Sequence, residues 1–192
     1  MRISRVALVL MLCGGCAPAP AVIPDAGTAP TPAVVFDIDG TLTPRPLEFL
    51  EARPDAARAV RLFADKGYKI IYLSARDPHL KSATIHWLKH HQFPAGLVLV
   101  EETRADARHH DRFKTRMLRQ LRAQGWQPEY AYGDSSTDFT AYAAAGIPKQ
   151  RVFALRREHR SSCRRGAWEA CLDGWTGHLG DIEKTVPLAA AK

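Results

Sequence analysis

The chain has 192 residues, a formal net charge of +7 and 46% hydrophobic residues. This length is typical of one domain with a substantial core, and the ordinary composition excludes a collagen-like repeat, a wholly disordered chain and a polytopic membrane protein. The mild basic excess favours anionic partners without identifying them.

The first residues have the layout of a secretory signal peptide. A basic start precedes an apolar run at residues 6–13, which is shorter than the ~20 residues of a transmembrane helix, so we predict that residues 1–15 are removed. The stretch LCGGC resembles the lipobox of bacterial lipoproteins, which implies that Cys16 carries a lipid anchor. An ordinary signal peptide cut slightly later is the alternative. The expected location is the periplasmic side of the bacterial envelope, and Ala17 favours the outer membrane.

Residues 16–32 are predicted to form an extended tether. They are rich in proline and alanine and contain almost nothing that could form a core. In a polyproline conformation, at ~3.1 Å per residue, such a tether would hold the folded part roughly 50 Å from a membrane. The folded domain is therefore expected to span residues 33–192.

From residue 33 onward, strand-like runs alternate with helix-like runs. The segments with strand character are residues 33–36, 69–73, 96–100, 130–132 and 151–154. The segments with helical spacing are residues 55–66, 80–91, 112–124 and 137–145. This alternation predicts an α/β fold, a three-layer Rossmann-like sandwich with a mostly parallel sheet. The segment after Leu155 has no clear assignment, except that residues 182–186 could pack back as a short terminal element.

Carboxylates follow two of the predicted strands. Asp37 and Asp39 come directly after the first strand, and Asp134 and Asp138 come after the fourth. Because parallel sheets place their ligands beyond the carboxyl ends of the strands, we expect these side chains to converge. Carboxylates are costly to bury without a cation, and their oxygens are the ligands that Mg²⁺ prefers. The sequence therefore predicts a Mg²⁺ site formed by all four aspartates.

Further donors indicate a phosphate ligand. Gly40 permits an unusual backbone conformation, and Thr41 can donate its hydroxyl beside the exposed backbone amides of the same turn. Ser74 and Lys114 add a hydroxyl donor and a positive charge, which stabilise phosphoryl oxygens during group transfer. We predict that these four residues bind phosphate.

Four segments carry a family resemblance. They are VVFDIDGTLT at 34–43, IIYLSAR at 70–76, Lys114, and GDSSTD at 133–138. Their order and spacing resemble the four motifs of the haloacid dehalogenase superfamily of phosphohydrolases. The resemblance implies that residues 33–192 form a phosphatase domain with Mg²⁺ as its cofactor. The ion would be held by Asp37, the backbone carbonyl of Asp39 and Asp134, with Asp138 in support. It also implies that Asp37 is a nucleophile forming an aspartyl-phosphate and that Asp39 is the general acid and base.

A narrower resemblance covers most of residues 34–154. This region is similar to the catalytic domain of lipin-type phosphatidate phosphatases and to the related domain of phosphatidylinositol-transfer proteins. Lipins typically carry Asn where this chain has Asp134, so the chain departs from them toward other phosphatases of the superfamily. Non-catalytic relatives that bind phosphatidate have lost carboxylates of the first motif, whereas this chain keeps Asp37 and Asp39.

The connections between the predicted strands leave no room for a large cap domain. A site without a lid is open, which suits a phosphate presented on a lipid surface or on a large molecule. We therefore expect a phosphomonoesterase that acts on a lipid phosphate such as phosphatidate. One alternative is an exported acid phosphatase of broad specificity for soluble esters, and another is a phosphatidate-binding module without turnover.

A basic segment follows the last predicted strand. Its cationic residues are Arg156, Arg157, His159, Arg160, Arg164 and Arg165. If that strand is parallel to its neighbours, the segment begins at the catalytic edge and could hold an anionic headgroup or a membrane surface. A solvated basic loop is the alternative. No motif of a nucleic-acid-binding fold supports a nucleic-acid partner.

Cysteine and histidine pairs complete the candidate sites. Cys163 and Cys171 remain after export, and an exported compartment permits them to form a disulfide. Two separate thiols are the alternative. His86 and His90 are four positions apart on a predicted helix, but no third ligand is evident, so we do not expect a zinc site.

Overall fold

The computed structural model describes residues 23–27, 30–46, 48 and 50–190. The predicted signal peptide at residues 1–15, the lipid-attachment residue Cys16 and residues 17–22 of the tether lie outside the described residues. Within the described part of the chain, no helix combines the length and the apolar character needed to cross a bilayer.

A parallel sheet forms the centre of the fold. Its strand order is β3-β2-β1-β4-β5-β6, and every neighbouring pair is parallel. The strands are β1 (Thr31–Phe36), β2 (Lys69–Leu73), β3 (Leu97–Leu99), β4 (Trp126–Gly133), β5 (Val152–Leu155) and β6 (Ala170–Leu172). The strand order reverses between β1 and β4, and open parallel sheets bind their ligands at such a switch point.

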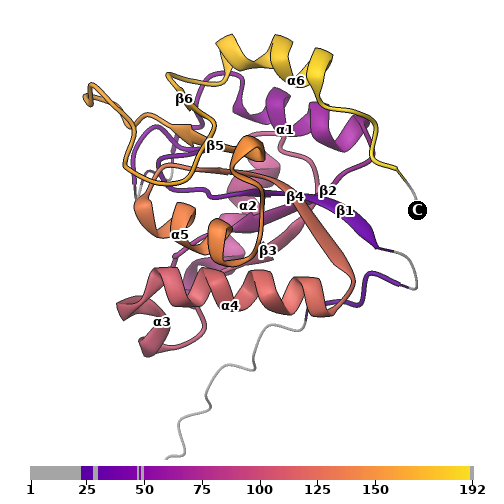
Figure 1. Cartoon of the computed structure of the whole chain (residues 1–192). Coiled ribbons are helices and arrows are strands. Elements are labelled where there is room, and N and C mark those ends of the chain that lie inside the picture. Colours follow the sequence, from indigo (N-terminus) through magenta and orange to yellow (C-terminus); the bar gives the residue numbers. More distant parts are fainter. Residues whose placement is uncertain (1–22, 28–29, 47, 49, 191–192) are drawn as a thin grey trace, which may run out of the picture.

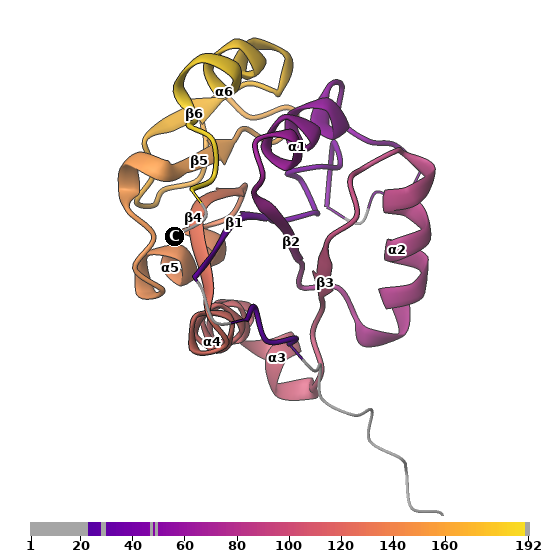
Figure 2. The same ribbon diagram turned by 90° about the vertical axis from the view of Figure 1, so that its right-hand side faces the viewer.

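Helices cover both faces of this sheet (Figures 1 and 2). The described helices are α1 (Ala56–Asp65), α2 (Lys81–His90), α3 (Arg104–Arg108), α4 (His110–Ala123), α5 (Ser136–Ala144) and α6 (Leu179–Thr185). Short 3₁₀ turns occupy Pro78–Leu80, Lys149–Arg151 and Thr176–His178. The core on one face includes residues of α1, α2 and α6, and the core on the other includes residues of α4 and α5. These layers confirm the predicted three-layer α/β sandwich without a large cap.

The alternation of side chains along β1 explains why two cores exist. Val34 and Phe36 contribute to the core under α1, whereas Ala33 and Val35 contribute to the core over α4. All four residues have 0% exposure. A strand that is buried on both faces has no polar side to present, which is why this segment reads as a continuous apolar run.

Two short elements were not expected from the sequence. β6 has only three residues, too few for a periodic pattern to appear, yet it pairs with β5 and extends the sheet. Helix α3 has five residues and begins at a capping box in which the Thr103 hydroxyl accepts from the Asp106 backbone amide. The expected terminal element near residues 182–186 exists as α6, which begins and ends slightly earlier.

The folded unit also begins earlier than the sequence indicated. The boundary expected at residue 33 falls inside β1, which starts at Thr31. Before it, the backbone amide of Ala26 donates to Gln124 at 2.9 Å, and the indole of Trp126 donates to the Pro24 carbonyl at 2.8 Å. The end of the predicted tether is therefore packed on the domain, because its backbone groups find partners beside the start of β4.

Candidate active site

The candidate site lies where β1 and β4 end side by side. Asp37 follows β1 directly, and its backbone amide donates to the Tyr132 carbonyl of β4 at 2.9 Å. Asp134 follows β4, and α5 begins two residues later. Because neighbouring parallel strands end at the same edge, residues about one hundred positions apart meet there.

Three carboxylates form the centre of the site. One oxygen from each of Asp37, Asp134 and Asp138 lies within 4.8 Å of the others, and all three residues are buried. The capping box of α5 fixes Asp138, whose Oδ2 accepts from the backbone amides of Asp134 at 3.1 Å and of Ser135 at 3.0 Å. We call these three residues the carboxylate triad.

Two cationic side chains contact the carboxylate triad. Lys114 is 2% exposed, and its Nζ donates to Asp37 Oδ1 at 2.5 Å and to Asp138 Oδ1 at 2.6 Å. Arg157 donates from its Nε to Asp134 Oδ2. The predicted placement of Lys114 at the site is therefore found, although in this structure its partners are the carboxylates that surround it.

Burial and mutual repulsion control the protonation of the carboxylate triad. Burial and the neighbouring Asp138 raise the pKa of Asp37 well above its usual value, and Lys114 only partly opposes this rise. Burial also raises the pKa of Asp134 to about 6, against the lowering effect of Arg157. Burial by itself would lower the pKa of Lys114, but Asp138 and Asp37 raise it, so the ammonium stays charged. Such a cluster is deficient in positive charge.

Asp39 lies in a different environment from Asp37. Its carboxylate forms an ion pair with Arg76, with Nε donating to Oδ2 at 2.9 Å and Nη2 donating to Oδ1 at 3.0 Å. The Ser74 hydroxyl also donates to Asp39 Oδ2 at 2.9 Å. The side chain of Asp39 is not one of the clustered oxygens, and the resemblance assigns only its backbone carbonyl to the metal, so that contribution stays a prediction. Ser74, expected on phosphate, here positions Asp39.

The turn after Asp39 packs directly against the carboxylate triad, and its backbone amides donate within the turn. Gly40 has a φ of +81°, and a Cβ atom there would lie 2.1 Å from Asp134 Oδ2, so any other residue would be strained and would displace the Asp134 carboxylate. Its amide donates to Thr43 Oγ1 at 2.9 Å, and the Thr41 amide donates to the Ile38 carbonyl at 3.2 Å. These amides, expected to be exposed, already have partners, because a tight turn satisfies its own backbone groups. Phosphate binding by Gly40 and Thr41 stays a prediction.

Arg53 and Arg76 are site residues that sequence reasoning missed, and Arg157 was expected only as part of the basic segment. Arg53 is a third arginine of the site, and it is buried. Its Nη2 donates to the Gly40 carbonyl and to the Arg156 carbonyl, each at 2.8 Å, and so links the turn to the segment after β5. Arg76 ends the quoted IIYLSAR motif and Arg157 belongs to the basic segment, so both positions carried a signal. Arg53 carried none, because no local pattern shows where a long side chain ends.

The predictions for the cysteine pair and for the histidine pair have different outcomes. Cys163 and Cys171 form a disulfide, with their Cα atoms 5.7 Å apart. Among the described residues, the carboxylate triad is the group of three or more side chains that could hold a metal ion. His86 and His90 do not belong to it. The disulfide ties the basic segment to the edge strand β6.

Residues 34–156 match the family described as the LNS2 domain of PITM 1–3. This chain belongs to the LNS2 domain family. Over 139 residues, or 69% of the chain, this LNS2 domain is 30% identical to human membrane-associated phosphatidylinositol transfer protein 3. Over 135 residues it is 31% identical to human membrane-associated phosphatidylinositol transfer protein 1. The matches span only 13% and 10% of those longer proteins.

The fold of this LNS2 domain also resembles solved structures. A crystal structure described as a HAD-like phosphatase from Mesorhizobium loti aligns with a TM-score of 0.58. The alignment covers 85% of this chain and 90% of that chain, at 15% sequence identity. This likeness agrees with the α/β architecture expected from the haloacid dehalogenase motifs.

The carboxylate triad of this LNS2 domain suits a divalent cation. Three carboxylate oxygens that are buried and mutually close provide hard ligands for Mg²⁺. Burial and repulsion among the carboxylates raise the pKa values of Asp37 and Asp134, so the ionised cluster is disfavoured without a further cation. A bound cation would supply that compensation, so the residues present fit the expected cofactor.

Proposed function

We propose that this LNS2 domain hydrolyses a phosphomonoester, with Asp37 as the nucleophile and Mg²⁺ as the cofactor. The observation that carries the proposal is the pairing of a buried carboxylate triad with a second, separately held carboxylate, Asp39, at the open edge of the sheet. A nucleophile and a proton donor in different environments are what a two-step displacement requires.

In the first step, an oxygen of Asp37 attacks phosphorus and the bond from phosphorus to the ester oxygen breaks. Asp39, once it leaves its ion pair with Arg76 and takes up a proton from solvent, gives that proton to the departing oxygen. In the second step, Asp39 takes a proton from water, whose oxygen attacks the aspartyl-phosphate and releases inorganic phosphate and free Asp37. Lys114 stays charged beside Asp37 and neutralises the phosphoryl oxygens.

Mg²⁺ held by the carboxylate triad would orient the phosphate and neutralise its charge. Asp37, Asp134 and Asp138 are the residues whose side chains would hold it. Arg157 contacts Asp134 in this structure, so it stands where it can meet either Asp134 or a bound phosphate.

The proposed substrate is a lipid phosphate such as phosphatidate. Two observations support this class: the residues that the structure describes form no large cap domain over the site, and the curated relatives are named as phosphatidylinositol transfer proteins. We include in the proposal an exported location with a lipid anchor at Cys16. The disulfide between Cys163 and Cys171 supports export, because disulfides persist in oxidising compartments.

Non-catalytic lipid binding is the second candidate function. It is favoured by the relatives, whose names describe lipid transfer. Against it stand both aspartates of the first motif and the organised contacts around them. A broad acid phosphatase for soluble esters shares the chemistry of the main proposal and differs from it in substrate.

Phosphate release by the purified protein tests these candidates. We would compare phosphatidate vesicles with soluble phosphomonoesters, in Mg²⁺ or EDTA, for the parent protein and the Asp37→Asn variant. Release that requires Mg²⁺ and Asp37 supports the enzyme, and a higher rate on vesicles supports the lipid substrate. A folded protein that binds phosphatidate but releases no phosphate from any ester would establish the binding module instead. Incorporation of labelled palmitate, lost in Cys16→Ser, tests the anchor.

A further inference from the structure

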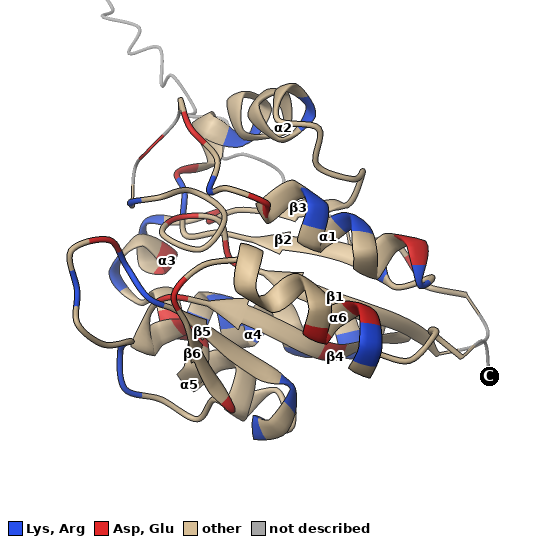
Figure 3. Ribbon diagram, turned by 90° about the horizontal axis from the view of Figure 1, so that it is seen from above, with Lys and Arg blue, Asp and Glu red and all other residues tan. Residues whose placement is uncertain are grey.

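The loop between β5 and β6 carries a concentration of positive charge close to the candidate site. We define the arginine loop as residues 156–165, in which five of the ten residues are arginine. In Figure 3, blue segments mark this loop beside β5 and β6. Since β5 is parallel to β4, the arginine loop leaves the sheet at the edge where the carboxylate triad lies.

Only part of this charge is neutralised within the protein. Arg156 pairs with Asp173 at 2.9 Å, and Arg157 pairs with Asp134. The side chains of Arg160, Arg164 and Arg165 are exposed and form no ion pair with any acidic residue that the structure describes. The loop therefore presents three uncompensated guanidinium groups.

These groups surround a cavity. It has a volume of about 360 Å³ and is lined by Arg157, Arg160, Arg164 and Arg165, together with serine hydroxyls and Cys163. One of those serines is Ser136, the first residue of α5. Guanidinium groups and hydroxyls are donors to anions.

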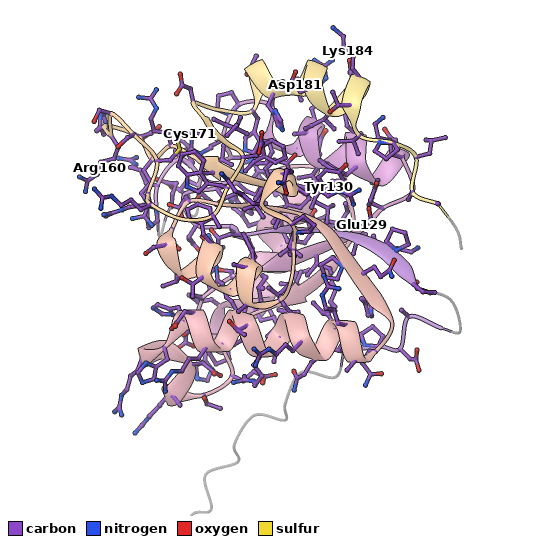
Figure 4. All side chains as sticks on the ribbon, viewed as in Figure 1. Glu129, Tyr130, Arg160, Cys171, Asp181 and Lys184 are labelled. Atoms are coloured by element: carbon purple, nitrogen blue, oxygen red, sulfur yellow. A yellow bond between two sulfur atoms is a disulfide. The ribbon has the colours of Figure 1, made fainter. Side chains whose placement is uncertain are left out.

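The walls of this cavity are held in place from several sides. The disulfide joins Cys163 to Cys171 of β6, as the position of Cys171 next to the loop shows in Figure 4. Gly166 lies so close to α5 that a Cβ atom would come within 2.4 Å of Phe139. The indole of Trp168 donates to the Arg164 carbonyl at 2.9 Å. A binding site that is fixed before the ligand arrives loses less entropy on binding.

Arg157 connects the cavity to the candidate active site. Its side chain lines the cavity and also donates to Asp134 of the carboxylate triad. A ligand with its phosphomonoester at Asp37 would thus have the donors of the cavity beside it. The side chain of Arg157 lies between the cavity and the carboxylate triad.

We propose that this cavity binds a second anionic group, a phosphate or carboxylate, next to the phosphomonoester at Asp37. The inference rests on the proposed function for the position of the first group and deepens it by naming the substrate class. The second anion has two sources: it belongs to the substrate itself, or it is the headgroup of a neighbouring lipid in an anionic surface.

The test compares two variants with the same change in net charge. Arg160→Gln/Arg164→Gln/Arg165→Gln removes the uncompensated arginines and leaves Arg157 in place. The control, Arg104→Gln/Arg108→Gln/Arg119→Gln, removes three exposed arginines of α3 and α4 that do not line the cavity. A general loss of positive charge affects both variants equally, whereas loss of a specific site affects only the first.

Turnover distinguishes the two sources of the second anion. We would measure kcat/KM on propyl phosphate and propane-1,3-diol bisphosphate, and on phosphatidate in phosphatidylcholine vesicles with and without phosphatidylglycerol. If the anion belongs to the substrate, the parent and control prefer the bisphosphate, and the loop variant loses about tenfold or more of that preference. If it is a neighbouring headgroup, phosphatidylglycerol raises the rate for parent and control but not for the loop variant. Equal behaviour of loop and control variants on all substrates would overturn the proposal.

A binding measurement separates this proposal from the proposed function. We would titrate the bisphosphate and the same vesicles into Asp37→Asn protein, with and without the loop substitutions. Weaker binding of either probe by the loop variant supports the cavity even if no ester is hydrolysed, in which case only the phosphatase proposal fails. Unchanged binding of both probes, together with normal turnover, contradicts the cavity and leaves the phosphatase proposal intact.

The disulfide gives a further readout. Because the link fixes the cavity wall, Cys163→Ser/Cys171→Ser is expected to weaken binding of the same probes by a few-fold without removing any charge. Binding as tight as in the parent, in a folded variant, would show that the cavity does not depend on being held open and would count against a preformed site.

Discussion

Asp37 and Asp39 are two residues apart in the sequence and lie in opposite electrostatic environments. Asp37 is 4% exposed and shares a buried site with two other carboxylates and Lys114. Asp39, whose side chain is 19% exposed, is held by donors from Arg76 and Ser74. The comparison teaches that one short motif can place its two carboxylates in different surroundings, because distant segments bring acids and Lys114 to Asp37 and bring only donors to Asp39.

Activity is the property in which the two aspartates should differ most. Asp37→Asn removes the nucleophile, so phosphate release should fall by at least about 10³-fold on any ester. Asp39→Asn removes the proton donor, so the loss should be about 10²- to 10⁴-fold on an alkyl phosphate and smaller on p-nitrophenyl phosphate, whose leaving group needs no proton. Initial rates on the two esters check this.

The matched control is Asp65→Asn, at the exposed end of α1. It should leave both rates unchanged. If Asp37→Asn and Asp39→Asn lose the same factor on both esters, the two aspartates do not have separate roles and the comparison fails.

Lys114 should be the main stabilising partner of the Asp37 environment. Lys114→Met leaves three buried carboxylates without their ammonium, so the free energy of unfolding should fall by about 3–5 kcal/mol in EDTA. Urea unfolding followed by circular dichroism measures this change. The control, Lys184→Met, alters an exposed lysine of α6 (Figure 4) and should have little effect. Equal effects of the two substitutions would contradict the assigned role of Lys114.

Mg²⁺ should raise the thermal stability through the carboxylate triad and not through the side chain of Asp39. A ligand present at 100 times its Kd stabilises the folded state by about 2.7 kcal/mol, which for a chain of this size raises Tm by about 5–10 °C. We expect that rise for the parent and for Asp39→Asn, and none for Asp134→Asn. Of the two substituted residues, Asp134 belongs to the carboxylate triad and Asp39 does not. Thermal unfolding with Mg²⁺ and with EDTA checks this, and a full shift in Asp134→Asn would remove the triad as the metal site.

Asp106 offers a contrasting carboxylate outside the site. Burial would raise its pKa, but hydrogen bonds from Arg116 and from backbone amides lower the pKa to about 2. Because this folded-state pKa is below the unfolded value, the stabilisation is complete at neutral pH and disappears as pH falls from about 4 through about 2. Asp106→Asn should therefore lower the free energy of unfolding by about 1 kcal/mol at pH 7, a modest amount because solvent screens the partly exposed Arg116. Near pH 2 the substitution should cost less, because Asp106 is then partly protonated. Urea unfolding at both pH values tests this, and an effect of equal size at both would exclude an electrostatic origin.

Much of the fold was predictable because its signals are local. The apolar runs at β1 and β2 and the helical spacing of α4 appear in the sequence and recur in the structure. β6 could not be predicted, because three residues carry no periodicity and the strand is formed by pairing with β5. The start of the folded unit before residue 33 depends on partners beside β4, about one hundred positions away.

The sequence by itself determined which carboxylates approach the switch point, because parallel strands deliver Asp37 and Asp134 to the same edge. Only the tertiary structure decided which cation meets which carboxylate. Lys114 reaches Asp37 rather than solvent, Arg76 reaches Asp39, and Arg157 reaches Asp134 from the arginine loop. Backbone patterns are set by neighbours along the chain, whereas the endpoints of long cationic side chains are set by burial and by the paths of distant loops.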